Sequence, residues 1–108
     1  MAQTILLTGA TGAVGPRVVH ALDRAGFQIR ALSFDAPAAG MFPQNVEVSI
    51  GDVTDKGTVQ SVMQGVDALV HMAAILHIVN PPPELREKYE RVNIGGTATV
   101  VEAAITPV

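Results

Sequence analysis

A glycine-rich loop near the start of the chain, TGATGAVG (8–15), constrains the possible folds more than any other stretch. It follows TILLT (4–8), a run of β-branched and leucine residues that is typical of a strand buried on both faces. It leads into AVGPRVVHALDRAG (13–26), which has a helical pattern with a proline in its first turn and a glycine at its end. The apolar stripe predicted for that helix is Val14, Val18, Ala21, Leu22 and Ala25. A strand, a glycine turn and a helix in direct succession predict a βα unit.

Strand and helix patterns alternate along the remainder of the chain. Further strands are expected at 27–33, 46–50 and 67–74, and further helices at 56–64 and 84–105. Because parallel strands need crossover connections, this order predicts an α/β fold, a Rossmann-type doubly wound parallel sheet. The expected strand order is 3-2-1-4 with helices on both faces, and the sheet is expected to be truncated to its first part. Residues 1–108 would then form one dinucleotide-binding domain.

Details of the two later helices can also be predicted. Thr54 or Asp55 is expected to cap the shorter helix, because both side chains can accept a hydrogen bond from a first-turn amide. The long helix is expected to bury an apolar face made of Leu85, Tyr89, Val92, Val100, Val101 and Ala104. Its charged residues are interpreted as a solvated face, formed by Glu84, Glu87, Lys88, Glu90 and Arg91.

The composition excludes several classes of function. Hydrophobic residues make up 48% of the chain and charged residues 16%, as in a folded globular domain. The net charge of −3 gives no reason to expect nucleic acid or an anionic membrane as a partner. Cysteine is absent, and the three histidines share no metal-ligand spacing, so no metal site is expected. No apolar run approaches a membrane span and no signal peptide is recognisable, so a cytoplasmic protein is expected.

The glycine loop predicts a phosphate site. It would lie at the carboxyl edge of the sheet, where the next helix directs its free N–H groups and the positive end of its dipole. Pyrophosphate is the usual anion at such a place. The predicted contact residues are Gly9, Ala10, Thr11, Gly12, Ala13, Val14 and Gly15. The spacing G-x-x-G-x-x-G is one residue longer than the dinucleotide fingerprint G-x-G-x-x-G, and an ordinary βα turn is the alternative.

Two further stretches are expected at the same edge of the sheet. In GDVTD (51–55), Asp52 could accept a hydrogen bond from an adenine amino group beside the Val53 backbone; a turn-forming Asx residue is the alternative. HMAA (71–74) ends the fourth strand with small residues that would let a cofactor lie against Met72, Ala73 and Ala74. Close packing beneath a helix is the alternative there.

Together these stretches resemble the short-chain dehydrogenase/reductase superfamily in its extended branch, which includes NAD-dependent epimerases, dehydratases and reductases. The matching stretches are TGATGAVG (8–15), GDVTD (51–55), HMAA (71–74) and VNIGGTATVVEAA (92–104), in the order of the family and across essentially the whole chain. The resemblance implies an NAD(P)-binding domain with pyrophosphate at residues 9–15, adenine at 52–53, and ribose or nicotinamide near 72–74. It also implies that the parent protein transfers hydride on a nucleotide sugar or a similar oxygenated substrate.

The start of the region 92–104 has residues that are unusual in a helix, because each glycine costs about 1 kcal/mol relative to alanine. These residues are Asn93, Gly95 and Gly96. The resemblance implies that Asn93 organises the end of the fourth strand near the cofactor. Close packing of the helix on the sheet is the alternative explanation.

The end of the second strand bears on the choice between NAD and NADP. A carboxylate there binds the ribose 2′-hydroxyl and repels a 2′-phosphate. The acidic position usual in the family falls on Ser33, followed by Phe34, while Asp35 lies two residues later. Arg30 precedes them within the strand rather than at its end. Both cofactors remain open, and Asp35 favours NAD.

The catalytic residues of the family have no counterpart in this sequence. The family uses a tyrosine that exchanges a proton with the substrate oxygen and a lysine four residues on that lowers the pKa of the tyrosine. The sole tyrosine, Tyr89, is followed four residues later by Asn93, and the lysines are Lys56 and Lys88. We therefore expect no catalytic residue in these 108 residues and interpret Tyr89 as part of the helix core.

Two classes of function follow from this sequence. The first is the cofactor-binding portion of an extended dehydrogenase, epimerase or reductase. The second is a small non-catalytic module that binds a dinucleotide or a partner protein. A sheet without a fifth strand would leave the fourth strand as an edge with unpaired backbone groups. Self-association through that edge or through the helix faces is therefore expected.

Overall fold

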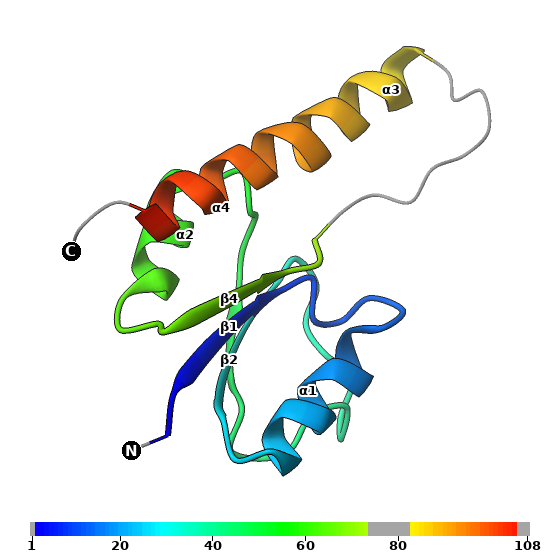
Figure 1. The fold of residues 1–108 in the computed structure, drawn as a ribbon. Coiled ribbons are helices and arrows are strands. Elements are labelled where there is room, and N and C mark those ends of the chain that lie inside the picture. Colours follow the sequence, from blue (N-terminus) through cyan, green and yellow to red (C-terminus); the bar gives the residue numbers. More distant parts are fainter. Residues whose placement is uncertain (1, 74–82, 106–108) are drawn as a thin grey trace.

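The fold is a four-stranded parallel sheet with helices on both faces, as the sequence predicts (Figure 1). The computed structural model describes residues 2–73 and 83–105, without the side chains of Leu85 and Tyr89. The sheet has the order β3-β2-β1-β4. The strands are β1 (Thr4–Thr8), β2 (Gln28–Ser33), β3 (Glu47–Ile50) and β4 (Ala68–His71). The helices are α1 (Gly15–Arg24), α2 (Lys56–Met63), α3 (Pro83–Tyr89), the π-helix η1 (Glu90–Gly95) and α4 (Gly96–Ile105).

The sheet separates two apolar cores, one under each layer of helices. On the face covered by α1, Leu7 packs with Val19 and Ile29. On the face covered by α2 and α4, Leu6 packs with residues that include Val59 and Val100. Successive residues of β1 thus serve opposite cores, which explains why this strand is continuously apolar rather than alternating.

The buried face of α1 differs from the predicted stripe. Val19 is fully buried, and Val18 and Leu22 pack against the same core. Ala21 and Ala25 are exposed, so their assignment to the stripe was wrong. Val14 precedes the first helical residue and is 60% exposed. The helix docks with positions 18, 19 and 22 toward the sheet, which places 21 and 25 in solvent.

The ends of α2 and β4 refine the predicted boundaries. Of the two candidate caps for α2, Asp55 is the one used, since its carboxylate accepts a hydrogen bond from the Thr58 amide at 3.2 Å. β4 ends at His71 rather than at residue 74, because its partner β1 ends at Thr8 and the chain then turns at a glycine. Ala74 lies outside the described residues.

The long helix is one continuous rod in Figure 1, but its middle is not α-helical. Residues Glu90–Gly95 form a π-helix, so the long helix predicted over 84–105 consists of two α-helical segments joined by a π-helical one. Two threonine hydroxyls bond back to carbonyls of this segment: Thr97 donates to Asn93 at 2.6 Å, and Thr99 donates to Gly95 at 2.9 Å. Such bonds satisfy carbonyls where the helical repeat changes.

The glycines of this rod serve different purposes. A Cβ at Gly96 would lie 2.7 Å from Cγ2 of Val53, so close packing explains this glycine. The contact is with the segment between β3 and α2 rather than with the sheet itself. A Cβ at Gly95 would meet nothing within 4 Å, and packing does not explain that residue.

The buried and exposed faces of this long helix agree with the prediction only in part. Val100 is buried, whereas Val101 is 49% exposed and Ala104 is also exposed, so these two do not belong to the buried face. Ala103 instead packs against the core beneath α4. The charged side chains assigned to the solvated face are exposed, as predicted. Across the described residues no helix is both long and apolar enough to cross a membrane.

Candidate functional site

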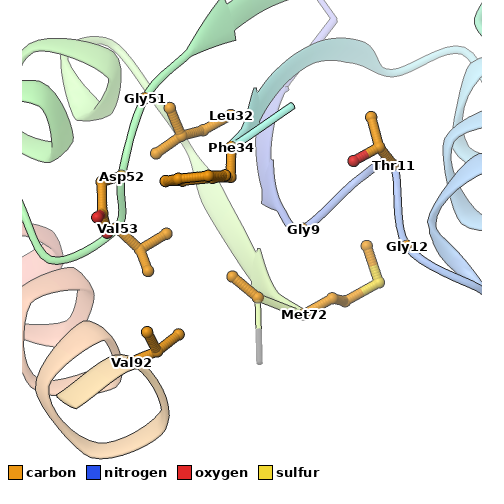
Figure 2. A pocket seen from close by; sticks show the side chains of 11 residues that line it. Gly9, Thr11, Gly12, Leu32, Phe34, Gly51, Asp52, Val53, Met72 and Val92 are labelled. Carbon is orange, nitrogen blue, oxygen red and sulfur yellow. The ribbon is translucent and has the colours of Figure 1, made fainter. Parts of the chain in front are cut away.

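A cavity of about 240 Å³ opens at the carboxyl edge of the sheet, where the three predicted stretches meet (Figure 2). The glycine loop, the turn after β3, and the residues after β4 each contribute to its lining, as does η1. In Figure 2, Phe34 and Asp52 lie on one side of the cavity, and Thr11 and Met72 lie on the other. The lining residues are Gly9, Thr11, Gly12, Leu32, Phe34, Gly51, Asp52, Val53, Met72, Ala73 and Val92.

Gly9 shapes the loop through both its conformation and its contacts. Its φ is +68°, in the left-handed region that side chains disfavour. A Cβ on Gly9 would lie 2.6 Å from the Ala73 nitrogen and 2.7 Å from the Met72 carbonyl carbon. The chain therefore turns sharply out of β1, as predicted, and it also passes directly against the backbone that follows β4.

The start of α1 has the features of an anion site. A Cβ on Gly15 would overlap the Ala10 carbonyl. Gly15 therefore lets the helix begin in close contact with the glycine loop. The helix has no side-chain hydrogen bond at its N-cap, Val14, and no acidic residue in its first turn. The positive end of its dipole is thus not offset by a side chain of this turn.

Asp52 forms the Asx turn that was the alternative interpretation of this residue, and it also lines the cavity. Its Oδ1 accepts hydrogen bonds from the Thr54 amide at 2.9 Å and from the Thr54 hydroxyl at 2.7 Å. The amide bond, followed by the hydroxyl bond, holds the pKa of the Asp52 carboxyl below its ordinary value. Asp52 is therefore ionised at neutral pH, and within residues 2–73 and 83–105 it is the one charged residue that lines the cavity.

About half of the predicted contact residues line this cavity. Ala10 is fully buried in the core beneath α1, Ala13 and Val14 are exposed on the loop, and Asn93 is adjacent in sequence to the lining residue Val92. Sequence reasoning missed Leu32, Phe34, Gly51 and Val92. The sequence contains a signal for Phe34, because an aromatic residue follows directly after an apolar strand. In the structure its side chain is 72% exposed.

The residues that bear on the cofactor choice lie around the end of β2. Asp35 is exposed and does not line the cavity. Ser33 is 1% exposed, and its hydroxyl has no hydrogen-bond partner within the part of the chain that is described. The Arg30 guanidinium donates to the carbonyls of Val62 at 2.7 Å and Gln64 at 2.6 Å, so it caps the end of α2. These bonds engage the Arg30 guanidinium at the end of α2.

A polar cluster supports the wall formed by Met72 and Ala73. The Thr8 hydroxyl accepts the amides of Met72 at 3.1 Å and Ala73 at 3.2 Å. It also lies 2.5 Å from Nδ1 of His71, whose Nε2 lies 3.0 Å from the Thr97 hydroxyl. Burial lowers the pKa of His71 from its ordinary 6.5. No group of three or more metal-ligating side chains occurs among residues 2–73 and 83–105.

The lowered pKa of His71 predicts an acid-sensitive stability. Below pH 6.5 the unfolded chain binds a proton that the folded chain resists, so the free energy of unfolding should fall until the lower folded pKa is passed. Asp52 acts in the same direction, but only below its ordinary value of 3.8. Urea unfolding at about pH 7.5 and about pH 5.5 measures the His71 effect.

A variant of His71 separates the effect of this histidine on the free energy of unfolding from the other titrations of the chain. His71→Gln should reduce the loss of stability between these two pH values. The same acid sensitivity in wild type and His71→Gln would contradict the assignment.

Comparison with known proteins identifies the family. The sequence profile of the 3-beta hydroxysteroid dehydrogenase/isomerase family matches residues 6–107. The chain belongs to this family. A 3 beta-hydroxysteroid dehydrogenase/Delta 5-->4-isomerase of Mycobacterium tuberculosis is 34% identical, with 92% of this chain and 27% of the relative covered. An NAD-dependent glucose-6-phosphate dehydrogenase of Haloferax volcanii is 35% identical, with 97% and 39% covered.

Solved structures agree with this family and with the fold. A short-chain dehydrogenase/reductase superfamily protein of Agrobacterium tumefaciens with bound NAD is 29% identical, with a TM-score of 0.80 over 94% of this chain and 29% of that one. An epimerase of Methanothermobacter thermautotrophicus is 28% identical, with a TM-score of 0.83 over 95% and 32%. The resemblance to extended short-chain dehydrogenases is confirmed. The chain spans between 27% and 39% of the length of these four proteins.

Proposed function

We propose that residues 1–108 are the NAD-binding domain of an oxidoreductase that exchanges hydride between NAD and a carbon bearing oxygen. The observation that carries this proposal is the cavity, which joins the glycine loop, the turn at Asp52, and the residues after β4. Its volume is below the roughly 300–1,000 Å³ of a site for a whole drug-sized ligand, so it suits one part of a dinucleotide. NAD supplies the hydride chemistry when bound, and the described residues bind and orient it.

The adenine end of the cofactor is assigned to the side of the cavity that holds Asp52. The turn uses Oδ1 of this carboxylate, which leaves Oδ2 to accept a hydrogen bond from the adenine amino group. Leu32, Phe34 and Val53 supply apolar walls for a flat heterocycle. These residues fit a purine better than a phosphate, which the Asp52 charge would repel.

The pyrophosphate is assigned to the loop between β1 and α1. Gly12 lines the cavity, and a Cβ there would meet only the Gly9 carbonyl at 3.2 Å. The backbone can therefore approach a phosphate closely. The start of α1 supplies the positive end of a helix dipole without a competing carboxylate. Met72 and Ala73 are then assigned to the ribose or nicotinamide side.

NAD is proposed over NADP. Among the described residues, those that line the cavity include no lysine or arginine, and Arg30 is bound to the end of α2. A 2′-phosphate would thus gain no cation from these residues, while Asp35 would repel it. The substrate is not assigned, since the relatives include both steroid and sugar dehydrogenases. A nucleotide sugar remains one hypothesis among these, and a cytoplasmic location remains a prediction.

The variant Asp52→Asn tests the adenine assignment. Asparagine keeps the oxygen that accepts from Thr54, so the turn should persist, but its amide nitrogen would face the adenine amino group as a second donor. We expect the Kd for NAD, measured by calorimetric titration, to rise about tenfold, as for the loss of one hydrogen bond to a charged group. The wild type should bind NAD more tightly than NADP.

Asp55→Asn is the matched control, because Asp55 belongs to the same turn but caps α2 and does not line the cavity. It should leave the Kd unchanged. Failure of the wild type to bind either dinucleotide would refute the proposed function. Equal losses in both variants would refute only the role of Asp52.

Self-association is proposed for the isolated 108-residue chain. In the described part of the chain β4 pairs with β1 alone, so one edge of β4 carries backbone groups without a ladder partner. Val101 and Ile105 are also exposed on α4, by 49% and 75%. Sedimentation velocity over a range of concentrations should reveal dimers or larger species. A single monomeric species at the highest concentration would contradict this proposal.

A further inference from the structure

A chain of polar groups connects β1, β4 and the π-helix η1 behind the cavity. It runs from the amides of Met72 and Ala73 to the Thr8 hydroxyl, then to the two ring nitrogens of His71. It continues through the Thr97 hydroxyl to the Asn93 carbonyl. Met72 and Ala73 line one wall of the cavity, and Val92 of η1 lines another. The chain of groups therefore links two walls that come from distant parts of the sequence.

The donors and acceptors fix the direction of every bond in this chain. The Thr8 oxygen already accepts two amides, so its single proton is donated to Nδ1 of His71. Thr97 donates its own proton to the Asn93 carbonyl at 2.6 Å, so its oxygen must accept from Nε2. His71 is therefore neutral and carries its proton on Nε2. A proton on Nδ1 would place two donors opposite each other.

We propose that His71 is a positioning residue for the cofactor site: in its Nε2–H tautomer it ties the end of β4 to the Asn93 carbonyl of η1 and so sets the separation between the two cavity walls. This inference rests on the proposed function for its link to the cofactor. His71 itself does not line the cavity, so it acts through the residues that do.

The chemistry of the imidazole suits this role. Its two nitrogens lie on opposite sides of the ring, and it can accept on one side while it donates on the other. An amide side chain of asparagine or glutamine is too short to reach both hydroxyls in one rigid plane. The bond from Nε2 also holds the Thr97 oxygen, whose proton satisfies a π-helical carbonyl. His71 thereby stabilises η1 where the helical repeat changes.

The tautomer is tested on the protein without any cofactor. Two-dimensional ¹H–¹⁵N spectra of the histidine rings distinguish the two neutral tautomers and the cation. We expect His71 to be the Nε2–H tautomer at neutral pH. Observation of the Nδ1–H tautomer or of the cation would overturn the inference, whether or not the protein binds NAD.

The positioning role is tested with variants of Thr97, whose side chain is exposed. Thr97→Val removes the acceptor of Nε2–H and the donor to Asn93, whereas Thr97→Ser retains both. We expect Thr97→Val to weaken NAD binding about fivefold and to accelerate amide exchange in residues 90–97 by a similar factor. Thr97→Ser should stay within about twofold of the wild type in both measurements.

Thr99→Val is the matched control, because Thr99 makes the same backward bond, to Gly95, without a histidine behind it. It should accelerate local exchange less and leave NAD binding within about twofold of wild type. Equal effects of Thr97→Val and Thr99→Val would overturn the role of His71. If the wild type binds no NAD, the proposed function fails, and the exchange rates still decide whether His71 stabilises η1.

Discussion

Replacement of Gly9 by alanine is expected to destabilise the protein by about 2–5 kcal/mol. Two costs add in this estimate. The left-handed φ of +68° disfavours any residue with a Cβ, and that Cβ would lie 2.6 Å from a backbone nitrogen at Ala73. A backbone atom cannot rotate away as a side chain can, so the loop or the end of β4 must move. Urea unfolding with a linear extrapolation measures the change in free energy.

Gly65→Ala separates the two costs. Gly65 has a φ of +75°, close to that of Gly9, but a Cβ there would meet nothing within 4 Å. This variant should lose only the conformational part, about 1–2 kcal/mol. If Gly9→Ala costs no more stability than Gly65→Ala, then the close approach of the loop to the end of β4 is not a tight contact in solution.

The strand order was predictable from local patterns because each element has its own periodicity. The continuous apolar run of β1 and the glycines after it determine a βα unit, and right-handed crossovers then leave few arrangements of the remaining strands. The same logic predicts Gly9, Asp52 and Met72 at one edge of the sheet. Carboxyl ends of parallel strands meet there whatever the details of packing.

Other features depend on tertiary contacts that no local pattern encodes. Gly15 and Gly96 are required by the Ala10 carbonyl and the Val53 side chain, and each of those partners becomes known only when the helices are docked. The π-helix η1 was missed because a helical pattern of apolar residues does not distinguish an α repeat from a brief π repeat. The phase of α1 was misjudged because alanine and valine are both apolar, while only docking decides which is buried.

The hydrogen-bond network of Thr8 and His71 also depends on tertiary contacts that no local pattern encodes. The sequence marks Thr8 only as the polar end of an apolar strand, and His71 only as part of HMAA. Their partnership requires that β1 and β4 pair with Thr8 opposite His71. That register is a property of the sheet, and it brings together residues separated by 63 positions.

Replacement of Thr8 by valine should reveal how much this network contributes. Valine is β-branched like threonine and has nearly its shape, so the apolar packing at this fully buried position should persist. The Ala73 amide, however, loses the hydroxyl that accepts it at 3.2 Å, and Nδ1 of His71 loses its donor. The expected cost is about 1–3 kcal/mol in the free energy of unfolding, as for a polar group left without a partner.

Thr8→Ser is the control for this substitution, because it keeps the hydroxyl and removes a methyl group, at a cost of about 1 kcal/mol. The two variants should differ most in the region of the cofactor. In Thr8→Val the Nδ1 of His71 loses its donor, and only the Thr97 hydroxyl still contacts the ring, through Nε2. The ring signals of His71 should therefore shift and NAD affinity should fall, whereas Thr8→Ser should retain both. If instead the valine variant is the more stable of the two and binds NAD as the wild type does, then packing at Thr8, rather than its hydroxyl, supports this edge of the sheet.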